Sequence, residues 1–250
     1  MFSRQELESL LERAGDNIEK PVKIYMIGGC ALSCKGLKPA TKDIDIIVTS
    51  KEDFNVFDSA MKEIGFQSMN DRENEFYLTA LAVYKKDESR IDVFLKQVGK
   101  MLFLTNSMIK RAEKYKKYEK LDVNLVSNED IFLFKSMTSR EGDVLDCDRI
   151  MKQGIDYDIV YNEIVEQSKE EGKRWFFWAY ESLCRLENFN GTKTPIKNKV
   201  FSLIKKHWNE KPNDFMDEIE NLKDHIPDKK LLKEFNSTSP TNNSSTIVKD

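Results

Sequence analysis

The sequence predicts an α+β fold, in which a small mixed β-sheet with flanking helices is followed by an all-helical C-terminal half. Two observations predict this division. Up to residue 126, short apolar β-branched runs alternate with helical patterns, whereas after residue 127 only helical spacing recurs. The last fifteen residues are rich in Ser, Thr and Asn, which is typical of a disordered tail. We therefore expect a sheet-based core over 1–126, a helical domain over 127–235 and a disordered tail over 236–250.

The first elements have clear boundaries. Ser3 followed by Glu6 is a capping-box pattern and predicts a helix that ends near Gly15. Residues 22–27 form a short β-branched run that ends in two glycines, which predicts a buried strand. A turn and a short helix over 31–35 should follow.

The rest of the sheet is predicted from similar patterns. Residues 43–48 should form a second strand, followed by a helix that Ser50 caps and that ends before Gly65. Residues 77–84 and 90–95 predict a hairpin around a polar turn over 85–89, and residues 121–126 predict one more strand. Beyond residue 127, apolar residues at helical spacing predict helices over 129–139, 143–153, 158–168, 175–186, 196–208 and 215–222.

Composition limits the possible classes of protein. The chain has 250 residues and a formal net charge of −3, so it lacks the overall basic character of sequence-independent DNA-binding proteins. Any nucleic-acid contact must then be local. No apolar run approaches the roughly 18 residues of a membrane span, and the first residues lack the apolar core of a signal peptide. We expect a soluble, cytoplasmic protein.

Cysteine and histidine are too few and too scattered for a zinc site. Only Cys30 and Cys34 are close in sequence, and both histidines lie far from any cysteine pair. We interpret these two cysteines as reduced thiols that pack the helix after the glycine turn.

Two acidic residues stand out in the second predicted strand. Because side chains alternate along a strand, Asp43 and Asp45 point to the same face while Ile44 points into the core. Like charges about 7 Å apart repel unless a cation lies between them, and carboxylates suit Mg²⁺ or Mn²⁺. Asp92, another single acidic residue in an apolar run, would complete a three-carboxylate, metal-binding catalytic site. Taken alone, the first pair is equally typical of a solvated edge strand.

Gly28 and Gly29 lie where the first predicted strand ends, and thirteen residues separate them from Asp43. A strand-to-helix turn without side chains lets backbone N–H groups approach a triphosphate. The alternative is a simple tight turn.

This arrangement resembles the polymerase-beta-type nucleotidyltransferase superfamily. The segments 29–32 and 41–45 are similar to the stand-alone prokaryotic branch that includes the AbiEii-type toxins. The resemblance covers about residues 22–160 and extends to Asp130, Lys135, Arg140, Asp143 and Asp146. The branch often has an Arg just before the Thr-x-Asp-x-Asp segment, whereas Pro39 and Ala40 precede Thr41 here.

The resemblance implies an NTP such as ATP as donor, a divalent cation as cofactor and Asp92 as the group that helps to deprotonate the acceptor hydroxyl. Lys135 lies among apolar residues, so it should reach either an anion, such as the triphosphate or the carboxylate cluster, or the protein surface. Arg140 is a second candidate phosphate contact or, alternatively, part of a surface ion pair.

The acceptor is not predicted as firmly. RNA, particularly a tRNA end, is favoured by the branch resemblance, which also implies a possible toxin role and an antitoxin partner. A small hydroxylated molecule or a protein side chain fits the same core, and so does a non-catalytic protein that retains the fold. A basic stretch with interleaved tyrosines is a candidate RNA contact or a solvated helix face: Lys110, Arg111, Lys114, Tyr115, Lys116, Lys117, Tyr118 and Lys120. The aromatic block 175–178 is interpreted as core packing rather than as a base-stacking platform.

Overall fold

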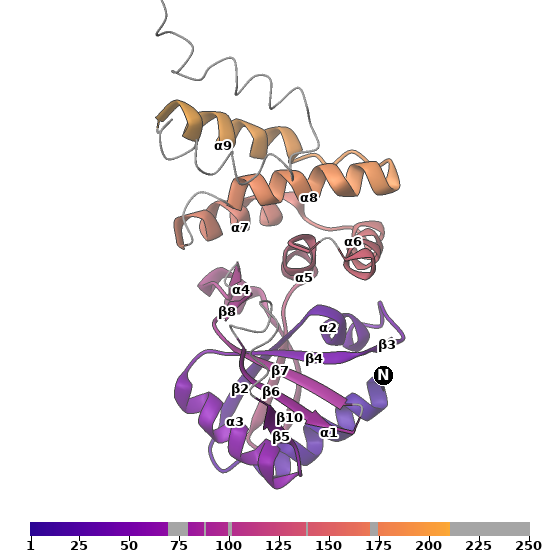
Figure 1. The fold of residues 1–250 in the computed structure, drawn as a ribbon, viewed down its shortest axis with the longest axis vertical. Coiled ribbons are helices and arrows are strands. Elements are labelled where there is room, and N and C mark those ends of the chain that lie inside the picture. Colours follow the sequence, from indigo (N-terminus) through magenta and orange to yellow (C-terminus); the bar gives the residue numbers. More distant parts are fainter. Residues whose placement is uncertain (70–79, 88, 100–101, 139, 171–174, 211–250) are drawn as a thin grey trace, which may run out of the picture.

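The computed structural model describes residues 1–69, 80–87, 89–99, 102–138, 140–170 and 175–210. It confirms the predicted α+β fold. A mixed sheet with its helices forms one half of the molecule, and five further helices form the other (Figure 1).

The main sheet has seven described strands in the order β10-β11-β2-β4-β7-β6-β5. It is mixed because β11 runs parallel to β2 and β4 runs parallel to β7, while the other neighbours are antiparallel. In sheet order, the strands span Glu113–Tyr118, Leu121–Leu125, Val22–Ile27, Asp43–Val48, Ser89–Leu95, Ala80–Lys86 and Gln67–Met69. Two short pairs lie outside this sheet: β1 (Phe2–Ser3) with β3 (Ala40–Thr41), and β8 (Gln97–Val98) with β9 (Leu102–Phe103).

The helices of the sheet half begin where their capping residues predict. Ser3 and Glu6 form the expected capping box of α1, and the Ser50 hydroxyl accepts a hydrogen bond from the Asp53 backbone at the start of α3. The helices of this half are α1 (Arg4–Asp16), α2 (Gly28–Cys34), α3 (Lys51–Glu63) and α4 (Asn106–Arg111). Of these, α2 contacts β2 and β4 and also α5 of the other half.

The helical half contains α5 (Asn128–Ser136), α6 (Glu141–Gln153), α7 (Tyr157–Glu170), α8 (Trp175–Asn190) and α9 (Lys197–Glu210). Trp175 and Phe177 are buried, which confirms core packing for the predicted aromatic block. Buried apolar residues of both halves belong to one contiguous cluster. The predicted boundary at 126/127 falls in the connection between β11 and α5 and stays a prediction.

Two predictions need correction, and three others lie wholly or partly outside the described residues. The first glycine of the pair begins α2, so the glycines form its first turn instead of a separate turn before a helix at 31–35. The basic stretch is not a helix face, because most of it forms the edge strand β10. The predicted helix over 215–222, the tail over 236–250 and the first residues of the predicted strand 77–84 lie outside the described residues.

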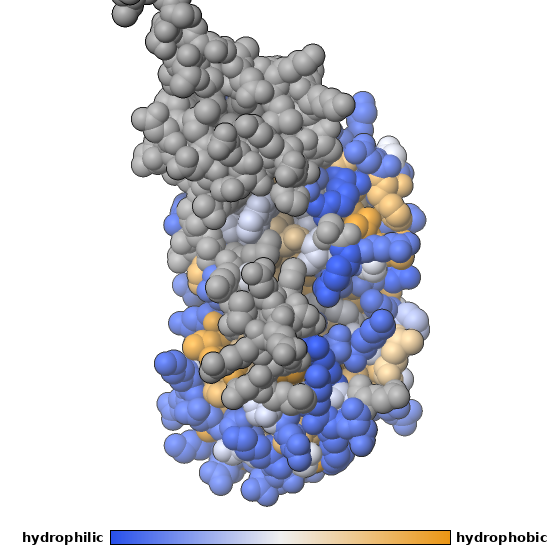
Figure 2. Space-filling view, viewed as in Figure 1, coloured by the Kyte–Doolittle hydropathy of each residue, from blue (hydrophilic) through white to orange (hydrophobic). Residues whose placement is uncertain are grey.

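The surface shown in Figure 2 is mostly hydrophilic where residues are described, with apolar groups in small separate areas. Within the described ranges, no helix is long and apolar enough to cross a membrane. Cys30, Cys34 and the other two cysteines are buried, in agreement with a packing role.

Candidate active site

A cavity of about 420 Å³ lies between the sheet and the helical half, and all seven predicted site residues line it. Its walls come from β4, β7, α2, the loop before β3, and the α5–α6 region. The structure thus brings together residues that are more than 100 positions apart in the chain. The predicted residues among its lining are Gly28, Gly29, Asp43, Asp45, Asp92, Lys135 and Arg140.

The register of two parallel strands sets the positions of the three carboxylates. Asp45 of β4 lies directly opposite Asp92 of β7, and Asp43 lies opposite Arg90. Because alternate residues share a face of the sheet, all three carboxylates face the same side. Asp92 is only 2% exposed, so its charge is held largely away from water.

The electrostatics of the three carboxylates are unfavourable to a full set of negative charges. Burial, followed by the charges of Asp92 and Asp43, raises the pKa of Asp45 to about 7. Burial also raises the pKa of Asp92, although a hydrogen bond from Arg90 opposes the effect. The Arg90 Nε donates to Asp92 Oδ1 at 2.9 Å. A site that disfavours its own carboxylate charges is ready to accept a cation.

The glycine pair leaves room for two polar side chains. Gly28 has a φ of +63°, and a Cβ placed on it would lie 2.8 Å from Asp45 Oδ2. A Cβ on Gly29 would lie 2.7 Å from the Thr41 hydroxyl oxygen, which itself donates to the Asp43 carbonyl oxygen at 2.9 Å. Neither position tolerates a side chain without movement of a residue that lines the cavity.

Lys135 is buried, as predicted, but its partners are not the predicted carboxylates. Its Nζ lies 2.6 Å from Asp143 Oδ1 and 2.9 Å from Asp146 Oδ2, and the residue is 7% exposed. The alternative that Lys135 reaches the protein surface is therefore wrong. The triphosphate role remains a proposal, because the ammonium group already has two anionic partners on α6.

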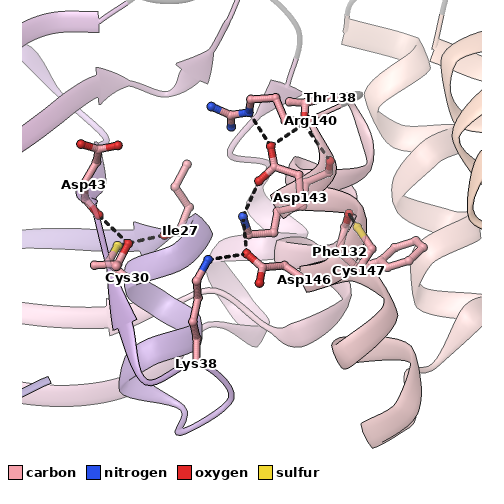
Figure 3. A network of polar contacts seen from close by, with 12 residues as sticks. Ile27, Cys30, Lys38, Asp43, Phe132, Thr138, Arg140, Asp143, Asp146 and Cys147 are labelled. Atoms are coloured by element: carbon pink, nitrogen blue, oxygen red, sulfur yellow. Dashed lines mark hydrogen bonds and ion pairs between the residues drawn. The ribbon is translucent and has the colours of Figure 1, made fainter. Parts of the chain in front are cut away.

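Arg140 and Lys38 extend this ion network (Figure 3). The Arg140 Nε donates to Asp143 Oδ2 at 2.6 Å, while its side chain is 67% exposed, so the predicted ion pair exists at the mouth of the cavity. On the other side, Lys38 Nζ donates to Asp146 Oδ2 at 2.9 Å. The wall opposite the carboxylates of β4 and β7 is consequently rich in cations.

The donor set fits Mg²⁺ or Mn²⁺ in its chemistry, because three carboxylates face one cavity and repel one another. Even so, no three His, Cys, Asp or Glu side chains within the described residues are close enough together to hold a metal ion as they stand. One oxygen of Asp92 already accepts a hydrogen bond from the Arg90 guanidinium. Metal binding at Asp43, Asp45 and Asp92 is thus still a proposal.

Arg90 and Lys38 are two charged residues of the site that were not predicted from the sequence. Arg90 could have been found, because it lies two positions before Asp92 and alternation places both on one face of the strand. Lys38 could not, since it lies in a loop whose path depends on the tertiary structure. Thr41 and Asp143 appeared in the family resemblance, without an assigned role.

The basic stretch presents fewer available charges than its sequence indicates. Arg111 is bound by two buried carboxylates, of Asp130 and Glu163, and is unavailable for RNA. Lys116 lies 3.6 Å from Glu8. Lys114 is 67% exposed and lies 3.9 Å from Asp122, so its pairing is weak.

No protein-family model matches the chain, and no curated protein sequence does either. Solved structures give distant likenesses. The crystal structure of ANT(2'')-Ia in complex with adenylyl-2''-tobramycin aligns with a TM-score of 0.44 and 10% identity, covering 65% of this chain and 97% of that one. The solution structure of the antibiotic-resistance factor ANT(2'')-Ia aligns with a TM-score of 0.47 and 9% identity, covering 68% of this chain and 95% of that one. The crystal structure of Thermotoga maritima TM1012, described as a candidate nucleotidyltransferase, aligns with a TM-score of 0.41 and 13% identity, covering 61% of this chain and 94% of that one.

Proposed function

We propose that this chain is a metal-dependent nucleotidyltransferase, which transfers NMP from an NTP to an acceptor hydroxyl. The observation that carries the proposal is the polarity of one cavity: three carboxylates on β4 and β7 face cations from α5, from the residue that precedes α6 and from the loop before β3. A volume of about 420 Å³ lies within the range of ligand pockets. The resemblance to the AbiEii-type branch supports the same reaction.

The reaction joins the acceptor oxygen to the α-phosphorus and releases pyrophosphate. When bound by Asp43, Asp45 and Asp92, a divalent cation lowers the pKa of the acceptor hydroxyl and neutralises phosphate charge. Asp92 is the proposed acceptor of the hydroxyl proton. Lys135 and Arg140 hold the phosphates at the opposite wall.

The first experiment tests the reaction itself. Purified protein is incubated with each labelled NTP, Mg²⁺ and total cellular RNA, and the labelled products are resolved by size and by nuclease sensitivity. Asp43→Asn and Asp45→Asn should abolish transfer, while Asp16→Asn, at the exposed end of α1, should leave it intact. Retained transfer in both cavity variants would overturn the proposed site.

For the acceptor we propose RNA, in particular a tRNA end. Lys114 and Lys117 are exposed on β10, three strands from β4, or about 14 Å along the sheet at the usual spacing. An RNA that reaches the cavity would span this distance with a few nucleotides.

Charge reversal at both lysines should raise the KM for RNA and weaken its dependence on salt, with the affinity for NTP unchanged. The matched control reverses Lys20 and Lys51, which are exposed elsewhere on the sheet half. If both double variants show the same dependence of RNA binding on salt, Lys114 and Lys117 do not form the RNA-binding surface. Label on a small molecule or on protein, with RNA unlabelled, would identify one of the alternative acceptors.

A toxin role follows from the same branch resemblance and is tested separately. Induced expression of the wild-type chain should arrest growth, whereas Asp43→Asn should not. An antitoxin partner would be a protein whose co-expression restores growth. Normal growth under wild-type expression would contradict the toxin role and leave the transfer reaction unaffected.

A further inference from the structure

A loop lysine reaches the wall of the cavity that the helices form. Lys38 lies in the connection between α2 and β3, yet its side chain is only 27% exposed, and its Nζ donates to Asp146 Oδ2 at 2.9 Å. The same Nζ lies 3.8 Å from the position that a Cβ on Gly29 would occupy. Figure 3 shows Lys38 extending from its loop to Asp146 on α6.

Asp146 holds two lysines at one oxygen. Its Oδ2 lies 2.9 Å from Lys38 Nζ and 2.9 Å from Lys135 Nζ, so the two ammonium nitrogens are separated by at most twice that distance. Its other oxygen accepts from Arg149 at 2.8 Å. The carboxylate is fully buried and therefore fixes its partners more firmly than a surface carboxylate would.

The network contains more cations than it needs for its own neutrality. The carboxylates of Asp143 and Asp146 are paired with three cations even when Arg140 is not counted. These cations are Lys38, Lys135 and Arg149. Two neighbouring ammonium groups repel each other, so one carboxylate offsets only part of the cost of holding both. The remaining positive charge lies beside the cavity, where it favours an anion with several oxygens.

We propose that Lys38 is a further phosphate-binding residue of the NTP site, held ready beside Lys135 by the positioning residue Asp146. This inference rests on the proposed function and adds a residue and a role to it. The triphosphate is the matching ligand, because separate phosphate oxygens engage the two ammonium groups at once.

The test compares variants that each remove one cation from Asp146. Lys38→Met and Lys38→Gln remove the cavity-lining cation, whereas Arg149→Met removes the partner that does not line the cavity. Binding of each of the four NTPs with Mg²⁺, and of the matching NMPs, is measured by calorimetry on the full chain. Both Lys38 variants should bind NTP about 10- to 100-fold more weakly, the range of a charge-assisted hydrogen bond.

Three further results are expected. NMP affinity should stay within about twofold of wild type, because the lost contact is to the β- or γ-phosphate. Arg149→Met should leave NTP affinity within about twofold, and Lys38→Arg should restore most of it because Arg also donates to phosphate. Thermal melts without nucleotide verify that each variant is folded.

The outcomes separate this inference from the proposed function. NTP binding by the wild type together with unchanged binding by both neutral Lys38 variants would overturn the role of Lys38 alone. Equal losses in Lys38→Met and Arg149→Met would assign Lys38 a structural role only, and would overturn it as well. Failure of the wild type to bind any NTP would instead overturn the proposed function, and this inference with it.

Discussion

Replacement of Lys135 by Met should destabilise the protein substantially. The ammonium group lies between two buried carboxylates, at 2.6 Å from Asp143 and 2.9 Å from Asp146. Removal of one partner of a buried ion pair costs about 3–5 kcal/mol. Each carboxylate keeps other donors, among them Arg140 and Lys38, so we expect the lower end, about 3 kcal/mol. At roughly 2–4 °C per kcal/mol for a chain of this size, Tm should fall by about 6–12 °C.

The pH dependence gives an independent measurement of the same network. Burial alone would raise the pKa of Asp143, but Lys135 and its other donors outweigh burial and lower it, and the pKa of Asp146 is lowered in the same way. A lowered carboxyl pKa stabilises the fold above the unfolded value of about 4, and this stabilisation is lost below it. The stability difference between wild type and variant should therefore be full near pH 7 and smaller near pH 4.

Thermal melts and urea melts at these two pH values provide the assay. Lys135→Met combined with Asp143→Asn should recover part of the lost stability, because the variant then buries one unpaired charge fewer. A fall in Tm of less than about 2 °C at pH 7, or the same difference at both pH values, would refute a buried ion network around Lys135. Kinetic effects of the variant are interpretable only below its own melting transition.

Three other perturbations test separate parts of the fold. Asp45→Asn should stabilise the metal-free protein at pH 8 by about 2 kcal/mol in urea melts, half of what the full rise in pKa would give, and by almost nothing near pH 4. The reason is that burial and the neighbouring carboxylates raise the pKa of Asp45 to about 7, so its ionisation destabilises the fold progressively as the pH rises from about 4 to about 7. A destabilised variant at pH 8 would contradict this. Gly28→Ala should lower Tm and abolish transfer, because its Cβ would meet Asp45. Gly36 also has a positive φ but nothing within 4 Å of a Cβ, so Gly36→Ala should cost only about 1 kcal/mol of backbone strain. If both variants lower Tm equally, the contact of a Cβ on residue 28 with Asp45 is not the cause. Arg111→Met should cost about 3–5 kcal/mol of stability, because it leaves the buried carboxylates of Asp130 and Glu163 without this partner. Lys110→Met, at a neighbouring position, should change Tm by less than about 2 °C. The same Tm for both variants would show that the buried pairing does not stabilise the fold.

The parts of the site that the sequence predicted depend on short-range rules. The alternation of side chains along β4 places Asp43 and Asp45 on one face, and the same rule applies to Asp92 on β7. Helix caps such as Ser3 and Ser50 depend on residues three positions away, so they were also predictable.

The parts that were missed depend on how distant elements pack. The partners of Lys135 lie on the next helix, so the angle between α5 and α6 decides which carboxylates it meets. The residues of β10 were interpreted as an RNA contact or a solvated helix face because the lysines obscure the alternation of a strand, and the pairing of β10 with β11 becomes visible only in the sheet. Lys38 reaches the cavity through the path of a loop, for which the sequence has no periodic signal.

The position of β11 in the sheet has a consequence for synthesis on the ribosome. This strand lies between β10 and β2, so β2 lacks one neighbour until residues 121–125 have been made, about 100 positions later. At usual rates of translation that interval lasts about 5–20 s. Most of the cationic wall comes later still, because Lys135 and Arg140 follow β11 in the chain, whereas Lys38 precedes β4. A nascent chain therefore carries its acidic strands, the glycine pair and Lys38 well before it carries Lys135 and Arg140, and release of the helical segment from the ribosome completes the site.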